Sequence, residues 1–223
     1  LPDLPPRTDV HVEVELGEAE RALYDDARLQ AIAEITTSTA DEDNRFKILA
    51  ALTRLRQLAC HPGLVDAGWT QGSGKLKAFL AIVDELRDGG HRALVFSQFT
   101  RHLGILRALL ESRGISYAYL DGRTPAKQRQ SRVDAFQAGE GDLFLISLKA
   151  GGKGLNLTGA DYVIHMDPWW NPAAEDQASD RAHRIGQLRP VTVYRLVAKD
   201  TIEEQILELH ATKRDLVSGI LSG

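Results

Sequence analysis

The residues with the most evident chemistry are one amide and two guanidiniums, Gln177, Arg181 and Arg184, in the segment NPAAEDQASDRAHRIG at 171–186. The Asn-Pro that opens this segment and the glycine that closes it are favoured helix boundaries, so we predict a helix between them. At about 100° per residue, the three side chains would share one helix face. They offer N–H donors and permanent charge, which suit phosphate oxygens. A solvated basic surface is the alternative, and the segment alone does not separate the two readings.

A glycine-rich loop, SLKAGGKGLN at 147–156, is the second candidate for anion binding. Gly152 and Gly154 permit positive φ angles and a close approach of the backbone to a ligand, while Lys149 adds positive charge. Such a loop can offer backbone N–H groups to phosphate or sugar. The alternative is a flexible turn with incidental lysines, which its place after an apolar strand makes the weaker interpretation.

The tetrapeptide GSGK at 72–75 resembles part of a phosphate-binding P-loop but lacks the rest of it. A P-loop needs an earlier glycine, where Trp69 stands, and a Ser or Thr after the lysine, where Leu76 stands. We therefore interpret Ser73 as the cap of a following helix. No predicted strand ends in paired carboxylates that could hold Mg²⁺. The sequence predicts phosphate donors without a phosphate cradle, and no metal ligands.

Composition is that of an ordinary globular protein: 223 residues, 43% hydrophobic and 26% charged. The single cysteine, Cys60, excludes an internal disulfide, and the seven histidines lack metal-ligand spacing. No apolar run approaches the roughly 18 residues of a membrane span, so we expect no membrane partner and a cytoplasmic (nucleoid) or nuclear protein that is not secreted. The only methionine is Met166, from which we expect a piece of a longer chain.

Charge is distributed unevenly along the chain. The net charge of −4 argues against a nucleic-acid interface over the whole surface. Residues 1–62 carry 12 acidic and 7 basic side chains, whereas the segment from Arg181 to Lys199 carries five cationic side chains and no acidic one. A local basic track is therefore compatible with the acidic total.

The elements that must position these residues fall into two patterns. Residues 1–72 predict one strand at 10–16, two helices at 18–35 and 45–60, and a linker that begins at Gly68. Residues 73–200 alternate helices with short apolar strands, and a last helix occupies 201–223. Continuously apolar strands separated by helices indicate a parallel sheet covered on both faces. We predict a three-layer α/β domain with strands at 93–96, 116–120, 143–146, 162–166 and 191–197.

Polar residues follow these predicted strands, at the edge where parallel sheets bind ligands. They are Ser97 and Gln98, the Asp-Gly-Arg turn that ends in Arg123, the glycine-rich loop, and the segment 167–171. Trp170 in the last of these is more often a core residue than a ligand contact, although it could lean on a nucleic-acid strand. The convergence favours function over a merely solvated basic surface.

These strings, in this order, resemble the second RecA-like lobe of Swi/Snf-type DNA translocases, a branch of helicase superfamily two. The resemblance covers nearly the whole chain and is most specific in DPWWNP at 167–172 and DRAHRIGQ at 180–187; it also includes LPPR, LRQLACHP, SGKL, ALVFSQF, YLDGRT, SLKAGGKGLNLTGAD and TIEEQI. It implies a helical insertion over 1–72, a RecA-like lobe over 73–200 and a packing helix over 201–223.

The resemblance also implies roles for the candidate residues. Arg181 and Arg184 would reach the γ-phosphate of an ATP held by the partner lobe, with Arg184 as the foremost arginine finger and Gln177 orienting the site. Gly152, Gly154 and Asn156 would touch the nucleotide. Contacts with double-stranded DNA, mainly to phosphates, would come from Ser97, Gln98, Arg123, Ser147, Lys149 and Trp170.

The first lobe, with its P-loop and Mg²⁺-binding acids, has no counterpart in this sequence. We therefore expect a DNA-dependent ATPase that uses ATP and Mg²⁺ only in the full-length protein, acting on DNA or on a DNA-bound protein complex, and no ATPase activity from this chain alone. Two alternatives stay open: a non-catalytic RecA-like docking module, and the lobe of an RNA helicase.

Overall fold

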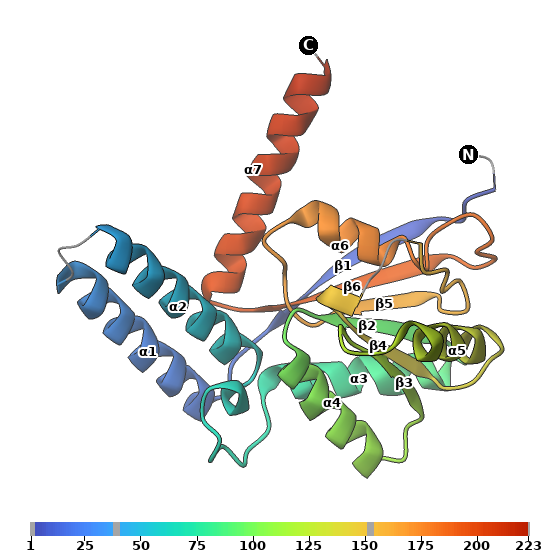
Figure 1. Ribbon diagram of the computed structural model, residues 1–223, viewed down its shortest axis with the longest axis horizontal. Helices are drawn as coiled ribbons and strands as arrows, with labels where there is room; N and C mark the ends of the chain where they lie inside the picture. Colours follow the sequence, from blue (N-terminus) through green and yellow to red (C-terminus); the bar gives the residue numbers. More distant parts are fainter. Residues whose placement is uncertain (1–2, 38–40, 151–153, 223) are drawn as a thin grey trace. The chain divides into compact units, whose positions relative to one another are not determined.

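A computed structural model describes residues 3–37, 41–150 and 154–222 (Figure 1). It divides into two compact units, residues 1–12 with 78–197 and residues 13–77 with 198–223, which we call the sheet unit and the helical unit. Among the described helices, none combines the length and the apolar character needed to cross a bilayer.

A six-stranded sheet in the order β1-β6-β5-β2-β4-β3 forms the centre of the sheet unit. Neighbouring strands run parallel: Ala93 of β2 stands beside Tyr162 of β5 on one side and Leu143 of β4 on the other. The carboxyl ends of these strands therefore meet at one rim, as the sequence predicted. The strands are β1 Arg7–Val14, β2 Ala93–Ser97, β3 Tyr117–Leu120, β4 Leu143–Ser147, β5 Tyr162–His165 and β6 Val191–Ala198.

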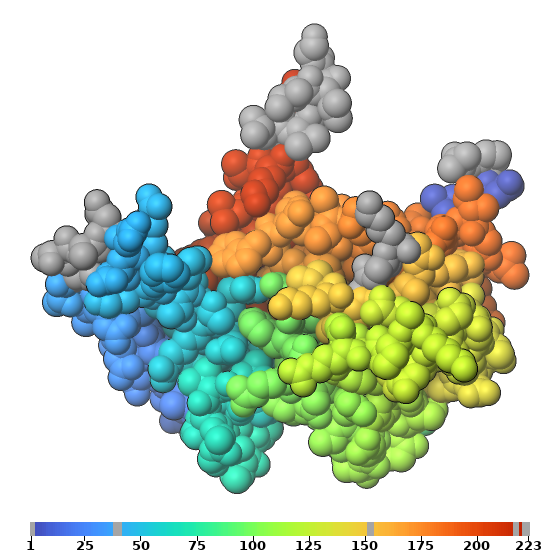
Figure 2. All heavy atoms as spheres, viewed as in Figure 1, coloured from blue at the N-terminus to red at the C-terminus, as the bar shows by residue number. Residues whose placement is uncertain are grey.

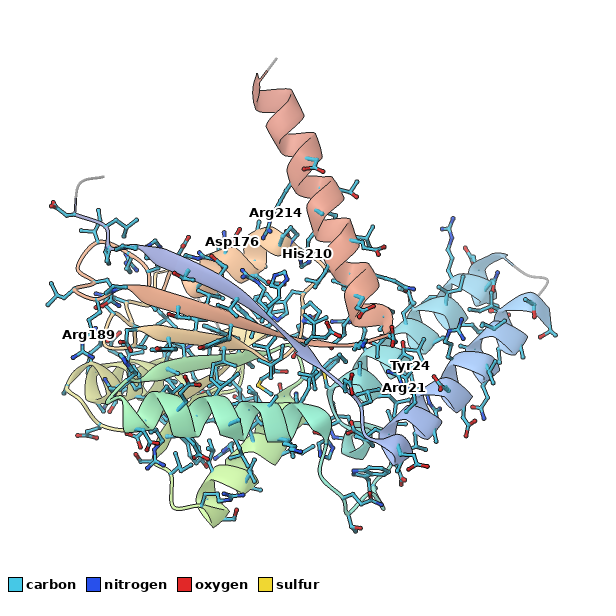
Figure 3. The ribbon with its side chains drawn as sticks, turned by 180° about the vertical axis from the view of Figure 1, so that it is seen from behind. Arg21, Tyr24, Asp176, Arg189, His210 and Arg214 are labelled. Carbon is cyan, nitrogen blue, oxygen red and sulfur yellow. The ribbon has the colours of Figure 1, made fainter. Side chains whose placement is uncertain are left out.

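Helices cover both faces of this sheet, which confirms the three-layer prediction; they are α3 Gly74–Asp88, α4 Thr100–Ser112, α5 Ala126–Gln137 and α6 Pro172–Ser179. The chain passes from β2 to the edge strand β3 and returns through β4, β5 and β6. Because crossovers between parallel strands are right-handed, this reversal puts α4 on one face and α5 and α6 on the other. Figure 3 shows α3 on the face away from α5 and α6.

The packing of the core explains why apolar and polar residues do not alternate along the central strands. Every residue of β2 and of β4 is buried, because each strand has neighbours on both sides and helices on both faces. On the α5 and α6 face, Leu94 and Phe96 pack in one cluster with Phe136 of α5 and Ala178 of α6.

The helical unit contains α1 Glu18–Thr37, α2 Asp41–Cys60, the short 3₁₀ helix η1 Pro62–Leu64 and α7 Ile202–Ser222. Its small core joins Tyr24 and Ala27 of α1 to Leu58 and Ala59 of α2. The Tyr24 hydroxyl accepts a hydrogen bond from the Ile202 N–H at 2.8 Å, and so fixes the start of α7 (Figure 3). No residue of 65–73 is helical or extended, in agreement with the predicted linker.

The compact units differ from the boundaries 1–72, 73–200 and 201–223 that the sequence suggested. The first strand, β1, joins the sheet: the Val191 N–H donates to the Pro6 carbonyl at 2.9 Å. The last helix joins the helical unit, where Arg21 of α1 donates to the carbonyls of Lys199 and Asp200. Local composition does not reveal which distant segments of the chain pair with each other, so it could not predict these units.

The helix predicted across 171–186 was wrong in its second half. Its start is confirmed, since Asn171 Oδ1 accepts from the Ala173 N–H at 3.1 Å, but α6 ends at Ser179. From 180 the chain continues in tight turns to Gly186. The Arg181 carbonyl accepts from the Leu157 N–H at 2.9 Å, so its hydrogen bond goes to another segment instead of to a further helical turn. Arg181 and Arg184 consequently do not share a helix face with Gln177.

Candidate functional site

Two serines end adjacent central strands at the rim that the carboxyl ends of the strands form. Ser97 and Ser147 are directly in register and both are buried. The Ser97 hydroxyl donates to Asp167 Oδ1 at 2.6 Å, and the other carboxylate oxygen accepts from the Gln98 N–H at 3.3 Å. Asp167 therefore ties the end of β2 to the turn after β5. The half-buried Gln98 side chain, which follows β2, donates to the Pro168 carbonyl at 2.9 Å.

The turn after β3 presents Arg123 to solvent. The Asp121 carboxylate accepts from the Arg123 N–H at 2.8 Å and from the Tyr119 hydroxyl at 2.9 Å. Burial works against the ionised form, yet these hydrogen bonds lower the pKa of Asp121, so it stays ionised and holds the turn. A Cβ built at Gly122 would lie 3.6 Å from the Lys149 Cβ, which places Lys149 beside this turn. Arg123 and Lys149 thus form adjacent exposed cations.

The end of the glycine-rich loop is hydrogen-bonded to the turns that carry the arginines. Gly154 has a φ of 92°, which a glycine adopts without strain, and Asn156 is exposed. The Leu155 carbonyl accepts from Arg184 Nη1 at 3.4 Å. Gly152 lies outside the described residues. The structure therefore brings together two predicted groups, the loop and the arginines. On the side of the loop, the contact is made by a backbone carbonyl.

Arg181 and Arg184 differ in exposure but share the absence of a carboxylate partner within the described part of the chain. Arg181 is half-buried, with its guanidinium carbon 5.5 Å from the centroid of the Phe96 ring. Burial, and then repulsion by Arg129, lower the pKa of Arg181. Arg184 is exposed, and so is Gln177 on α6. The two guanidiniums can accept an anion without first breaking an ion pair.

Gln187 holds the turns in place, a role that sequence reasoning missed. The two N–H groups of its buried amide nitrogen are shared among the carbonyls of Thr158, Ala160 and Ala182, which lie 3.0, 2.8 and 2.9 Å from the nitrogen. Its amide oxygen accepts from the Leu188 N–H at 3.0 Å. The segment that bears the arginines is therefore rigidly attached although it is not helical.

A buried ion-pair network holds the other side of α6, and it too was missed. Arg195 of β6 donates to Glu175 Oε1 at 2.7 Å and to Asp9 Oδ1 at 2.6 Å. The second Glu175 oxygen accepts from the Trp169 N–H at 2.9 Å, and so supports the turn that carries the half-buried Trp170. Burial opposes ionisation of Asp9, but hydrogen bonds from Arg7 and Arg195 lower its pKa to about 2. In the sequence, Glu175 is only an acid in the first turn of a helix, where it would favour the helix dipole. The sequence around it therefore did not indicate an ion pair with Arg195.

Comparison with known proteins agrees with this geometry. Residues 74–186 match the model of the helicase conserved C-terminal domain. The chain is similar to the Sulfolobus solfataricus SWI2/SNF2 ATPase C-terminal domain, with 30% identity, a TM-score of 0.80 and coverage of 96% of this chain and 89% of that one. The chain belongs to the SWI2/SNF2 family.

Further relatives are longer than this chain. The Sulfolobus solfataricus SWI2/SNF2 ATPase core in complex with dsDNA aligns with 98% of this chain and 46% of its own, at 34% identity and a TM-score of 0.84. An uncharacterized ATP-dependent helicase of Mycoplasma pneumoniae is 38% identical over 99% of this chain, and a mouse SWI/SNF-related regulator of chromatin is 37% identical over 98%. The chain spans about a fifth of the length of these two curated relatives.

The GSGK segment of this SWI2/SNF2 lobe serves structure, as the sequence predicted. The Ser73 hydroxyl accepts from the Leu76 N–H at 3.1 Å and so caps α3. Lys75 is fully buried, and its ammonium group lies 2.6 Å from Glu203 Oε1. Glu203 also accepts from the Ala198 N–H at 2.9 Å. Lys75 is therefore committed to a buried pair within the helical unit and is not available to a phosphate.

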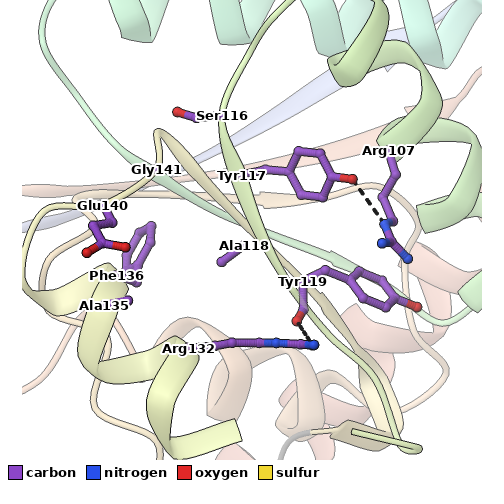
Figure 4. A pocket seen from close by; sticks show the side chains of 10 residues that line it. All are labelled: Arg107, Ser116, Tyr117, Ala118, Tyr119, Arg132, Ala135, Phe136, Glu140 and Gly141. Atoms are coloured by element: carbon purple, nitrogen blue, oxygen red, sulfur yellow. Dashed lines mark hydrogen bonds between the residues drawn. The ribbon is translucent and has the colours of Figure 1, made fainter. Parts of the chain in front are cut away.

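A groove of about 530 Å³ along the edge strand β3 contains none of the predicted site residues (Figure 4). The guanidinium carbon of Arg107 lies 4.0 Å from the centroid of the Tyr119 ring, and the Arg107 Nε–H donates to the Tyr117 hydroxyl at 3.2 Å. From the α5 side, Arg132 donates to the Tyr119 carbonyl at 2.7 Å. Charged side chains that occupy an edge strand in this way protect it from pairing with other strands.

Proposed function

We propose that this chain is the C-terminal motor lobe of an ATP-dependent double-stranded DNA translocase and supplies arginine fingers to an ATP bound mainly by the other lobe. Arg184 is the foremost finger, Arg181 supports it, and Gln177 orients the site. The observation that carries the proposal is the pair of guanidiniums at the rim, which have no carboxylate partner among the described residues. Arg184 also donates to the Leu155 carbonyl at the end of the glycine-rich loop. Such groups stabilise charge on the phosphoryl group during transfer.

DNA contacts belong to the outer groups of the same rim. Arg123 and Lys149 offer adjacent exposed cations to backbone phosphates, and Gln98 and Trp170 extend this surface over the ends of β2 and β5. The buried Ser97 acts through Asp167, which also holds the Gln98 backbone. Ser147 ends β4 beside it. The relative solved with dsDNA supports duplex DNA as the ligand.

ATP and Mg²⁺ are expected to bind the full-length protein. The donor set of the described rim fits phosphate oxygens, and we assign the metal and most of the nucleotide to the lobe that this chain lacks. Gly152, Gly154 and Asn156 would close on the nucleotide from this side. Closure excludes water from Arg181 and Arg184 and so strengthens their attraction for the phosphates. Alternating closure and opening would then move the lobes along DNA or past a DNA-bound protein complex.

The decisive experiment uses the full-length protein that contains this lobe. Arg184→Ala should lower DNA-stimulated kcat for ATP by about 10³-fold, the lower end of what an arginine finger contributes, with DNA affinity largely kept. The matched control is Arg189→Ala, because Arg189 is an exposed cation of the same segment that already lies 3.7 Å from Asp161. A loss of less than tenfold in the Arg184 variant, or an equal loss in the control, would contradict the finger assignment.

The same assay separates the remaining alternatives. A docking module would show little change in either variant, and an RNA helicase would be activated by duplex RNA in preference to duplex DNA. This chain by itself should hydrolyse no ATP with duplex DNA present, because it lacks the P-loop lobe. Turnover by the purified chain would refute that expectation.

A further inference from the structure

Arg129 lies in the first turn of α5, and its side chain contains an unexplained buried donor. The Nε–H is inaccessible to solvent and has no hydrogen-bond acceptor among the residues that the structure describes, whereas the backbone N–H donates to the Pro125 carbonyl at 2.9 Å. A buried N–H without an acceptor destabilises the folded state, because it loses its hydrogen bond to water without replacement. Such a donor is rare enough in folded proteins to require a specific reason.

The neighbour of Arg129 is another cation. Repulsion by the positive charge of Arg129 adds to burial in lowering the pKa of Arg181. Neither guanidinium has a carboxylate within 4.0 Å among the described residues. Two like charges at a partly buried place, without a counter-charge, are unfavourable in the unliganded protein.

Packing brings the two arginines to the same face of the sheet. Val133 and Phe136 of α5 share a hydrophobic cluster with Phe96 and Ala182. The Arg181 guanidinium lies over Phe96, and Arg129 precedes Val133 by one helical turn. Figure 2 shows helix α5 at the surface, and the Arg129 and Arg181 side chains are each partly exposed.

We propose that Arg129 and Arg181 together form a site for one phosphate-class oxyanion, in which the anion accepts the orphaned Nε–H of Arg129 and neutralises both guanidiniums. This inference rests on the proposed function for its biological ligand, a phosphate group of either the nucleotide or the DNA backbone. Arginine suits this role because its planar fork offers two parallel donors to phosphate.

The proposal makes an unusual prediction about stability. A structural arginine stabilises the folded chain, so its removal lowers the unfolding midpoint. Removal of Arg129 instead relieves repulsion and an unsatisfied donor. We therefore expect Arg129→Met, which keeps much of the aliphatic stem, to leave the midpoint unchanged or to raise it when no phosphate is present.

The test is thermal unfolding of this chain with inorganic phosphate titrated against chloride at constant ionic strength. Phosphate at about ten times its dissociation constant should raise the wild-type midpoint by about 3–5 °C, and Arg129→Met should lose at least half of that shift. Arg132→Met on the same helix is the matched control: its midpoint should fall, because Arg132 donates to Tyr119, while the phosphate shift persists. If Arg129→Met does not fold, Arg129→Gln serves in the same assay.

Two outcomes overturn the site: no phosphate shift in the wild-type chain, or an equal shift in the wild type and the Arg129 variant. In the full-length protein, a raised KM for ATP with unchanged DNA affinity would assign the anion to the nucleotide. A weaker DNA affinity would assign the anion to the DNA backbone if the slope of log affinity against log salt concentration also became smaller in magnitude by about one. Loss of the phosphate shift in Arg129→Met alongside full ATPase activity of Arg184→Ala would refute the proposed function and leave the anion site standing.

Discussion

The buried pair between Glu175 and Arg195 gives the sharpest quantitative test of the fold around the site. Both side chains are almost wholly inaccessible, with exposures of 0% and 5%. Glu175→Gln keeps the shape of the side chain but removes its charge and one acceptor. The oxygen of the new amide can accept from either the Trp169 N–H or the Arg195 guanidinium. The amide NH₂ then faces the other donor, which is left without an acceptor.

The cost can be worked from these contacts. Loss of a hydrogen bond between charged groups costs about 1.5–3 kcal/mol, and a buried donor left without an acceptor costs about 1–3 kcal/mol. Arg195 keeps its contact with Asp9 at 2.6 Å, so the total should stay near the 3–5 kcal/mol typical of a broken buried pair. For a chain of this length, that corresponds to a fall of about 10–15 °C in the unfolding midpoint.

The assay is thermal unfolding followed by tryptophan fluorescence, since the Trp169 N–H donates to Glu175 and Trp170 follows it in the sequence. Asp180→Asn is the matched control: the same acid-to-amide change at an exposed carboxylate 3.6 Å from Arg7 should cost at most about 0.5 kcal/mol. An Asp180 effect as large as that of Glu175→Gln, or a Glu175→Gln cost below about 1 kcal/mol, would refute the reasoning.

Three further predictions follow from buried polar groups. Gln187→Leu should lower the free energy of unfolding by about 2–4 kcal/mol, because three carbonyls lose their donor, and a circular-dichroism melt would contradict this if the variant matched the wild type. Burial, then repulsion by Arg195 and Arg7, hold the pKa of His165 well below 6.5, so stability should fall as pH drops from about 7 to 5. In urea titrations that fall should be smaller for His165→Gln by up to about 1.4 kcal/mol per pH unit, and an equal slope would count against the assignment. Lys75→Met leaves Glu203 buried and unpaired and should cost about 3–5 kcal/mol, whereas adding Glu203→Leu should recover at least half; failure to recover would contradict a simple ion pair.

The strand-end clusters were predictable because local pattern and general topology suffice for them. Continuous burial of β2 and β4 requires apolar runs, and parallel pairing places whatever follows those runs at one rim. Ser97 and Ser147, in register at the ends of these strands, follow directly from that rule. The cap at Ser73 and the start of α6 at Asn171 were likewise readable, since a cap is a contact between residues two or three positions apart.

The end of α6 was not readable, because the competing hydrogen bonds come from elsewhere in the chain. The Arg181 carbonyl binds the Leu157 N–H, and Gln187 gathers the Thr158, Ala160 and Ala182 carbonyls. Helical spacing from 171 to 186 is a weak preference that tertiary contacts override. The geometric argument from one helix face therefore failed, although the arginines still lie beside the loop that the sequence selected.

The sequence by itself determined the family, the layered parallel sheet and the choice of rim residues, because these depend on residue type, periodicity and short-range order. Only the tertiary structure decided which charges are paired. Lys75, Glu175 and Arg195 are committed to buried partners, while neither Arg129 nor Arg181 has a carboxylate within 4.0 Å among the described residues. Charge pairing depends on distances between segments up to 186 residues apart, as in Asp9 and Arg195, and no local pattern encodes those distances.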